Sequence, residues 1–83
     1  GRMRLDLFLK ETRLIKRRTI AKELCDAGKV SINDKVSKPS AEVKEGDIVT
    51  LRLGFRPISG IAHIEMRGNR EIPSIEQIEI ANA

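Results

Sequence analysis

The sequence predicts an α+β fold in which two short N-terminal helices pack on a small, mostly antiparallel, twisted sheet. Two observations lead to this class: apolar residues recur at helical spacing before Gly28, and they alternate at strand spacing after it. A third is size and composition. With 83 residues, 40% of them hydrophobic and 34% charged, the chain suits one globular domain with a modest core.

The first helix is expected over residues 4–12. Leu5, Phe8 and Leu9 fall at positions i, i+3 and i+4, so they form one apolar face of a short amphipathic helix. Leu7 lies off this face, where we expect a secondary contact. Because the chain has two phenylalanines and no other aromatic residue, its core must be largely aliphatic.

The second helix is expected over residues 17–27. Ala21, Leu24 and Cys25 make its apolar face. Gly28 suits the end of this helix, because glycine adopts the left-handed backbone of a helix stop at little cost.

Strand patterns follow the second helix. Val30 and Ile32 alternate on one face, and Asn33-Asp34 is a good tight-turn pair before a short return strand. The later elements are a core contact at Val43, a turn at residues 44–47, a strand over 48–53 with Val49, Leu51 and Leu53 on one side, an irregular link at 54–60, a strand over 61–66 and a turn at 67–69.

The C-terminal tail has more than one interpretation. Ser74-Ile75-Glu76-Gln77 fits a helix capping box, whereas the residues that follow fit a strand or an unfolded end equally well. We expect a short ordered segment with frayed last residues.

Charge is distributed unevenly along the chain. Residues 1–22 hold eight basic and two acidic side chains, a net of +6, whereas residues 65–83 hold two basic and four acidic side chains, a net of −2. A basic front with a mildly acidic back favours a polyanionic partner on one side of the molecule. The alternative is an ordinary solvated charged surface.

Several function classes lack support. No apolar run approaches the roughly 20 residues of a membrane helix, so we expect no membrane partner. One cysteine, Cys25, cannot form an internal disulfide, which fits a reducing, cytoplasmic location. His63 has no second ligand or nucleophile near it in sequence, so no metal site, cofactor or catalytic residue is predicted. We take Met3 as the natural start and leave Arg2 out of the functional argument.

A basic triplet stands where the second helix begins. The triplet consists of Lys16, Arg17 and Arg18, and Thr19 follows it. The helix cap is either Thr19 or a residue nearer Lys16. Cations at the positive end of a helix dipole are unfavourable by roughly 0.3–1 kcal/mol. They become favourable when a phosphate arrives, because a guanidinium binds two of its oxygens. The rival interpretation is pairing of these cations with Glu11 or Asp26.

Further cations extend this predicted surface. Lys22 lies one helical turn after Arg18, and Arg4 and Arg13 lie nearby in the sequence. Lys29, Lys35 and Lys38 flank the first strand and its turn. Because few aromatic side chains are available for base stacking, backbone and shape recognition of folded RNA fits better than single-strand binding.

The sequence resembles the small RNA-binding domain named after ribosomal small-subunit protein four. The likeness covers about residues 4–53 and includes Arg4-Leu5-Asp6, Ala21-Lys22-Glu23-Leu24, the run from Gly28 to Asn33, and Gly46-Asp47. It departs at Asp34, where the family usually has glycine, but we expect the hairpin to survive. The resemblance implies the two-helix RNA-binding motif over residues 3–53, with residues 54–83 adding a C-terminal strand and a short extension to the same domain.

Free-standing copies of this size are similar to two groups. One is the fifteen-kilodalton heat-shock protein that binds separated large ribosomal subunits carrying peptidyl-tRNA, and the other is its shorter relative in ribosome-associated quality control. The resemblance implies a factor that contacts ribosomal RNA and tRNA on an obstructed large subunit and holds the tRNA during alanine tailing. We expect a monomer, and we expect no enzyme because the sequence has no cysteine pair, Gly-rich phosphate loop or Ser/His/Asp set. Its RNA-contacting positions are Arg4, Lys16, Arg17, Arg18, Thr19 and Lys22, with Arg13, Lys29, Asn33 and Lys35 as second choices. Asp6 is interpreted as structural, bonded to the helix start or to an arginine.

Other functions stay open. The same domain is often fused to RNA-modifying enzymes, so the chain could be a detached module of one. It could also be a structural ribosome-associated protein, or a protein-docking module whose binding is insensitive to salt.

Overall fold

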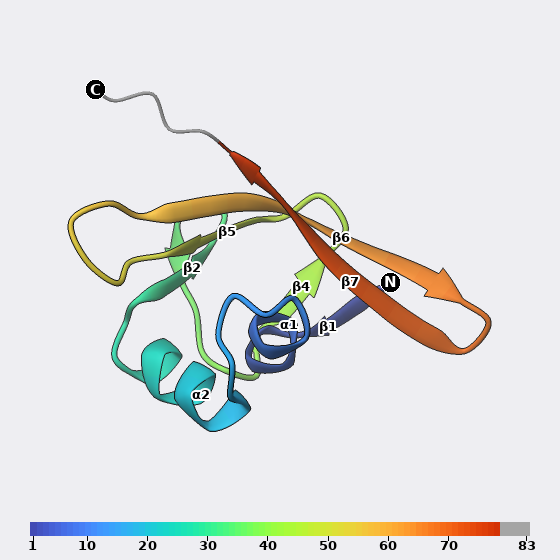
Figure 1. Cartoon of the computed structure of the whole chain (residues 1–83), viewed down its shortest axis with the longest axis horizontal. Coiled ribbons are helices and arrows are strands. Elements are labelled where there is room, and N and C mark those ends of the chain that lie inside the picture. Colours follow the sequence, from blue (N-terminus) through green and yellow to red (C-terminus); the bar gives the residue numbers. More distant parts are fainter. Residues whose placement is uncertain (79–83) are drawn as a thin grey trace.

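The computed structural model describes residues 1–78 and confirms the α+β class (Figure 1). In chain order the elements are β1 (Arg2–Arg4), α1 (Leu5–Glu11), α2 (Arg18–Asp26), β2 (Val30–Ile32), β3 (Lys35–Val36), β4 (Glu42–Lys44), β5 (Ile48–Leu51), β6 (Ile58–Arg67) and β7 (Arg70–Ile78). No helix in this part of the chain is long and apolar enough to cross a membrane.

The strands form two antiparallel groups. Five of them lie in the order β3-β2-β5-β6-β7, and β1 pairs separately with β4. The longest pairing joins β6 to β7, from Ser59 opposite Ile78 to Arg67 opposite Arg70. Figure 1 shows this hairpin extending past the helices, which lie together on one side of the sheet.

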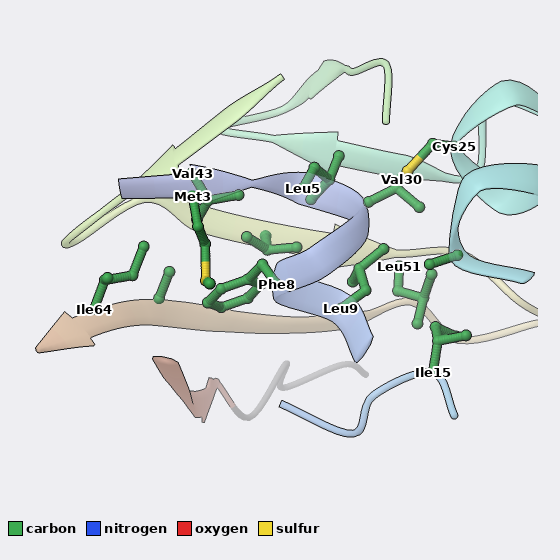
Figure 2. Packing of buried hydrophobic residues seen from close by; sticks show 13 residues of the cluster. Met3, Leu5, Phe8, Leu9, Ile15, Cys25, Val30, Val43, Leu51 and Ile64 are labelled. Atoms are coloured by element: carbon green, nitrogen blue, oxygen red, sulfur yellow. The ribbon is translucent and has the colours of Figure 1, made fainter. Parts of the chain in front are cut away.

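The core gathers around α1, as its spacing predicts. Leu5, Phe8 and Leu9 are fully buried, and Leu7 is partly buried against the same cluster. Figure 2 shows Leu5, Phe8 and Leu9 among residues of β1, β2, β4, β5 and β6. Full burial of one such side chain contributes about 1.5–3 kcal/mol relative to exposure, so α1 is a principal anchor of the fold.

The second helix buries its predicted face and begins within one residue of the predicted start. Ala21 and Cys25 are buried and Leu24 is partly buried. The N-cap is Arg17, whose side chain makes no capping bond, and Thr19 lies exposed in the first turn. Of the two predicted alternatives, the start nearer Lys16 is confirmed and the cap at Thr19 is not. Burial raises the pKa of the Cys25 thiol to about 11, with help from nearby carboxylates, so the thiol stays protonated.

The β2–β3 hairpin has the predicted two-residue turn. Asn33 and Asp34 both have positive φ, 52° and 68°, as a tight hairpin turn requires. The Asn33 side chain also accepts a hydrogen bond from the Ile48 N–H at 2.9 Å and donates one to Asp47 at 3.1 Å. Asn33 therefore ties this turn to the start of β5.

Some local predictions are corrected. Strand β5 ends at Leu51, and Leu53 is exposed instead of sharing the core face, because the chain leaves the sheet before it. Strand β6 begins at Ile58, three residues before the predicted start at 61. Strand β1 was not predicted, since three residues are too short to show a period.

The tail is a strand over its described length. Residues Arg70–Ile78 form β7, so the capping-box helix does not form. Pro73 fits here because β7 is an edge strand, where a missing N–H need not break a ladder. The predicted fraying of the last residues, 79–83, lies outside the described part of the chain.

Candidate nucleic-acid interface

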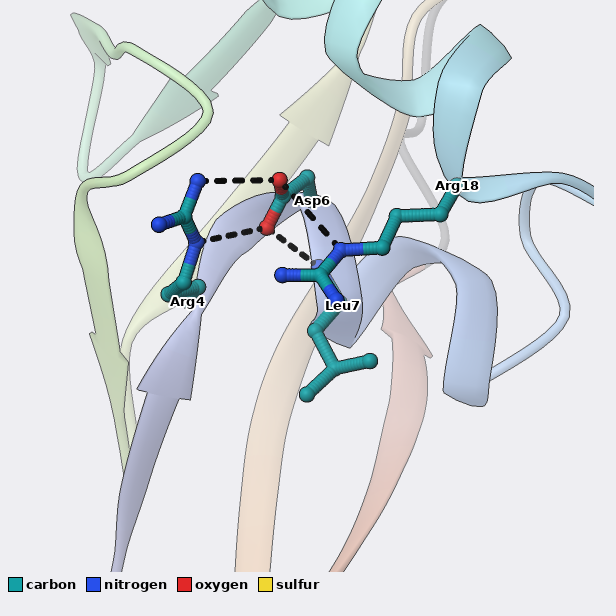
Figure 3. Close-up of polar contacts among 4 residues, drawn as sticks. All are labelled: Arg4, Asp6, Leu7 and Arg18. Atoms are coloured by element: carbon teal, nitrogen blue, oxygen red, sulfur yellow. Dashed lines mark hydrogen bonds and ion pairs between the residues drawn. The ribbon is translucent and has the colours of Figure 1, made fainter.

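A buried carboxylate organises the basic N-terminal region. Asp6, in the first turn of α1, is fully buried and faces two arginines from different elements. Arg4 donates from Nε to Oδ1 and from Nη2 to Oδ2, both at 3.2 Å, and the Arg18 Nε lies 3.5 Å from Oδ2. The Leu7 backbone N–H adds a bond to Oδ1 at 2.8 Å. Figure 3 shows the arginines approaching Asp6 from opposite sides, and we call Arg4, Asp6 and Arg18 the clamp.

The clamp keeps its carboxylate ionised. Burial alone would raise the pKa of Asp6, but the Arg4 side chain, the Leu7 N–H and Arg18 together outweigh burial and lower that pKa. The pKa of Arg4 is raised by the same hydrogen bond and charge. The interpretation of Asp6 as a structural partner of an arginine is consistent with this geometry.

The clamp changes the explanation of the basic triplet. Arg18 at the helix start is partly neutralised by Asp6, not by Glu11 or Asp26 as the rival interpretation supposed. Nevertheless, the side chains of Arg4 and Arg18 remain 47% and 45% exposed. With two cations to one carboxylate, the clamp carries a net positive charge and leaves part of each guanidinium open to a ligand.

Beside the clamp stands a second group of cations, which we call the open cations: Lys16, Arg17 and Lys22. All three residues are exposed, and no carboxylate in residues 1–78 lies within ion-pair distance of them. Lys16 and Arg17 directly precede α2, and Lys22 lies one turn beyond Arg18 on the helix. The start of α2 is thus surrounded by positive charge.

Arg13 lies in the connection between the helices in an unusual backbone conformation. Its φ is 65°, and its N–H donates to the Lys10 carbonyl at 3.0 Å as α1 ends. This left-handed backbone costs a residue other than glycine roughly 1–2 kcal/mol. Arg13 lines an open hollow of about 400 Å³ with Lys10, Glu11 and Lys16.

The structure separates the predicted site residues into two places. Arg4, Arg13, Lys16, Arg17, Arg18, Thr19 and Lys22 belong to the first two helices and their flanking segments. Lys29, Asn33 and Lys35 follow the other end of α2, which is about 13 Å away along a nine-residue helix. Lys35 is exposed on the edge strand β3, whereas the Asn33 side chain is engaged in holding the hairpin turn.

His63 makes contacts that its isolation in the sequence did not suggest. Its Nδ1 lies 2.6 Å from Glu45 and its Nε2 lies 3.0 Å from Glu76. The hydrogen bond with Glu45, and then that with Glu76, raises the pKa of His63. Residues 1–78 contain no cluster of three or more side chains suited to a metal ion. Because its two ring nitrogens contact Glu45 and Glu76, the histidine, which lies in β6, links that strand to β7 and to the β4–β5 turn.

Sequence reasoning also passed over the segment between β5 and β6. Phe55 is fully exposed there, between Arg52 and Arg56. A signal was present in the sequence, since residues 48–64 contain no acidic side chain.

The sequence of the chain is similar to a known domain family and to several characterised proteins. Residues 3–49 match the S4 domain. The chain is 60% identical over 57 residues to the RQC P-site tRNA stabilizing factor of Bacillus subtilis, covering 69% of this chain and 66% of that protein. The factor of the same name from Halalkalibacterium halodurans is 56% identical over 57 residues, covering 69% of this chain and 65% of that protein. The match thus spans slightly less than two thirds of those relatives.

Two further proteins match over a larger share of the chain. The RQC P-site tRNA stabilizing factor of Listeria monocytogenes is 41% identical over 70 residues, covering 83% of this chain and 76% of that protein. Among solved structures, trimeric heat shock protein 15 of Vibrio cholerae superposes with a TM-score of 0.71 at 32% identity, covering 86% of this chain and 82% of that one. The chain belongs to the S4 domain family.

Proposed function

We propose that this protein is an RNA-binding factor of bacterial ribosome-associated quality control. It contacts ribosomal RNA and peptidyl-tRNA on obstructed large ribosomal subunits and stabilises the tRNA there. The observation that carries the proposal is the group of open cations, which lie beside a positively charged clamp in a chain whose relatives bear the name P-site tRNA stabilizing factor.

The chemistry of the helix start supports a phosphate ligand. The N-cap residue Arg17 makes no side-chain bond to the first turn of α2, so N–H groups there lack a side-chain acceptor. Lys16 and Lys22 add charge without a carboxylate partner among the described residues. A phosphate would satisfy the N–H groups and the cations together.

The proposed contacts fall into two ranks. The first comprises Arg4, Lys16, Arg17, Arg18, Thr19 and Lys22, which the clamp and the α2 start hold close together in the fold. The second comprises Arg13, Lys29 and Lys35. Asn33 contributes through the shape of the β2–β3 turn, because both ends of its amide already bond within the fold.

The remaining features of the proposal concern organisation. We assign RNA binding to residues 3–53 and regard residues 54–83 as completing the same domain, which is supported by Ala62 and Ile64 of β6 lying in the one core cluster. The protein acts as a cytoplasmic monomer and as a binding factor, not as an enzyme. Sedimentation at several protein concentrations distinguishes a monomer from a trimer like that of its structural relative.

Sedimentation with ribosomal particles tests the function. We expect the protein to migrate with large subunits that carry peptidyl-tRNA and much less with empty large subunits or with small subunits. Arg17→Ala should reduce co-migration, whereas Arg70→Ala, at the distant β6–β7 turn, removes the same charge and should not. Preferential migration with small subunits, or equal loss in both variants, would contradict the proposal.

A further inference from the structure

The β5–β6 loop, residues 52–57, carries an exposed aromatic side chain that does not pack in the core. The chain has two aromatic residues: Phe8 is fully buried, and Phe55 is fully exposed. Leu53, two residues earlier in the loop, is also 53% exposed. Neither side chain belongs to the core cluster, so the fold gains little from their apolar character.

The loop is strongly biased toward positive charge. Arg52 and Arg56 flank Phe55, and residues 48–64 contain no aspartate or glutamate. No carboxylate in the described residues lies within ion-pair distance of either arginine. An exposed ring between two cations that have no carboxylate partner among the described residues suits a flat, anionic partner.

The first residue of the loop, Arg52, is hydrogen-bonded to the rest of the molecule. Arg52 donates from its backbone N–H to the Lys29 carbonyl at 2.8 Å and from Nη1 to the buried Ser31 hydroxyl at 3.0 Å. Lys29 in turn donates its N–H to Leu24 of α2 at 3.0 Å. In Figure 1 the loop lies at the same end of the molecule as the connection from α2 to β2. The residue at the start of the loop, Arg52, is therefore held directly against Lys29, next to the end of α2, and Phe55 follows three residues later.

We propose that this loop is a second RNA contact, in which Phe55 stacks on one unpaired base and Arg56 and Lys29 bind the adjoining phosphates. This inference rests on the proposed RNA-binding function and adds base contact to phosphate recognition by the helices. Every base offers a π-face, so a single ring selects an unpaired nucleotide without reading its identity. The positive charge of the loop favours RNA over an apolar protein surface, which would offer no anionic group to these arginines.

The test uses two RNAs and three variants at Phe55. One RNA is a hairpin with an unpaired loop, and the other is a blunt duplex with the same stem. Phe55→Leu keeps an apolar side chain but removes the ring, and we expect it to weaken hairpin binding about tenfold while duplex affinity changes little. Phe55→Ala should behave as Phe55→Leu does. Because the ring is exposed, the melting temperature should not change in either variant.

Phe55→Trp gives a direct readout of stacking. The chain contains no tryptophan or tyrosine, so this variant carries a single strong fluorophore at the proposed contact. We expect hairpin affinity to be retained or improved, with indole emission quenched when the hairpin binds and much less when the duplex binds. Unchanged emission in the bound hairpin complex would overturn the stacking proposal.

The outcomes separate this inference from the proposed function. If Arg17→Ala weakens binding to both RNAs while Phe55→Leu binds both as the wild type does, RNA binding stands and the stacking proposal is wrong. If the wild type binds neither RNA and does not bind large subunits, the proposed function itself fails. If Phe55→Leu weakens binding to large subunits but not to the hairpin, the loop contacts a protein, and the base-stacking proposal is overturned.

Discussion

The clamp and the open cations lie side by side at the start of α2 but differ in what holds them. Arg4 and Arg18 share the buried carboxylate of Asp6, whereas Lys16, Arg17 and Lys22 have no carboxylate partner in residues 1–78. The first group is part of the fold as well as of the proposed interface. Equal charges at one helix start therefore have different consequences when they are removed.

The largest expected effect is the loss of the buried carboxylate. Asp6→Ala removes the acceptor of Arg4, Arg18 and the Leu7 N–H and leaves a small void. Because both arginines are nearly half exposed and can turn to solvent, no buried charge is left unpaired, and the loss should be that of hydrogen bonds to a charged group, about 1.5–3 kcal/mol. Denaturant unfolding measures it, and Glu11→Ala is the control with an exposed carboxylate. Equal stability of the two variants would show that the clamp does not hold the fold.

Removal of a clamp arginine should have a mixed effect. Arg4→Ala deletes two charge-assisted hydrogen bonds and leaves Asp6 with Arg18, so we expect a smaller loss of stability than in Asp6→Ala, along with weaker RNA binding. Unfolding and RNA titration on the same samples separate the two effects. A stability equal to that of the wild type would contradict the structural role.

Arg13 should behave in the opposite way. Arg13→Gly relieves the left-handed strain at φ 65°, so we expect a gain of up to about 1 kcal/mol in unfolding free energy. The greater freedom of glycine in the unfolded chain offsets part of this gain. RNA affinity should fall because glycine cannot bind the phosphate proposed for Arg13. Arg13→Asn is the control, since asparagine tolerates the same backbone but carries no charge. A less stable Arg13→Gly would refute the strain argument.

The smallest effect concerns the exposed bridge at His63, which contrasts with the buried carboxylate of the clamp. Hydrogen bonds with Glu45 and Glu76 raise the pKa of His63 in the folded protein, so its stabilising effect is complete below about pH 6.5 and is lost as the pH rises through the raised value. The lowered pKa of Asp6 acts with the opposite sign, its stabilising effect being lost as the pH falls through that value. His63→Gln should flatten the stability profile above pH 6.5 alone. An unchanged profile in that range would show that the bridge does not contribute.

Sequence patterns predicted the elements that have an internal period or a clear turn signal, and they missed segments with neither. The apolar face of α1 and the Asn33-Asp34 turn follow from local spacing and turn chemistry, and both are confirmed. Strand β1 is too short to show a period, and Leu53 continued an alternation after the chain had already left the sheet. The strand form of residues 70–78 depends on pairing with β6, which no local pattern specifies.

The candidate site was predictable in its charges but not in its partnerships. The basic triplet and its neighbours stand out in composition, whereas the contact from Arg18 to Asp6 joins two helices and depends on how they pack. For the same reason His63 looked isolated, although Glu45 and Glu76 approach it from distant parts of the chain. Contacts between side chains of different elements depend on tertiary packing, and these contacts decide which charged groups remain available to a ligand.

The most direct test is the salt dependence of binding to large subunits that carry peptidyl-tRNA. For the double variant Lys16→Ala and Arg17→Ala, stability should change by less than about 0.5 kcal/mol, since both side chains are exposed. The slope of log affinity against log salt should become shallower by about 2, one for each phosphate that the variant no longer neutralises. A slope equal to that of the wild type would show that these cations do not bind RNA phosphates.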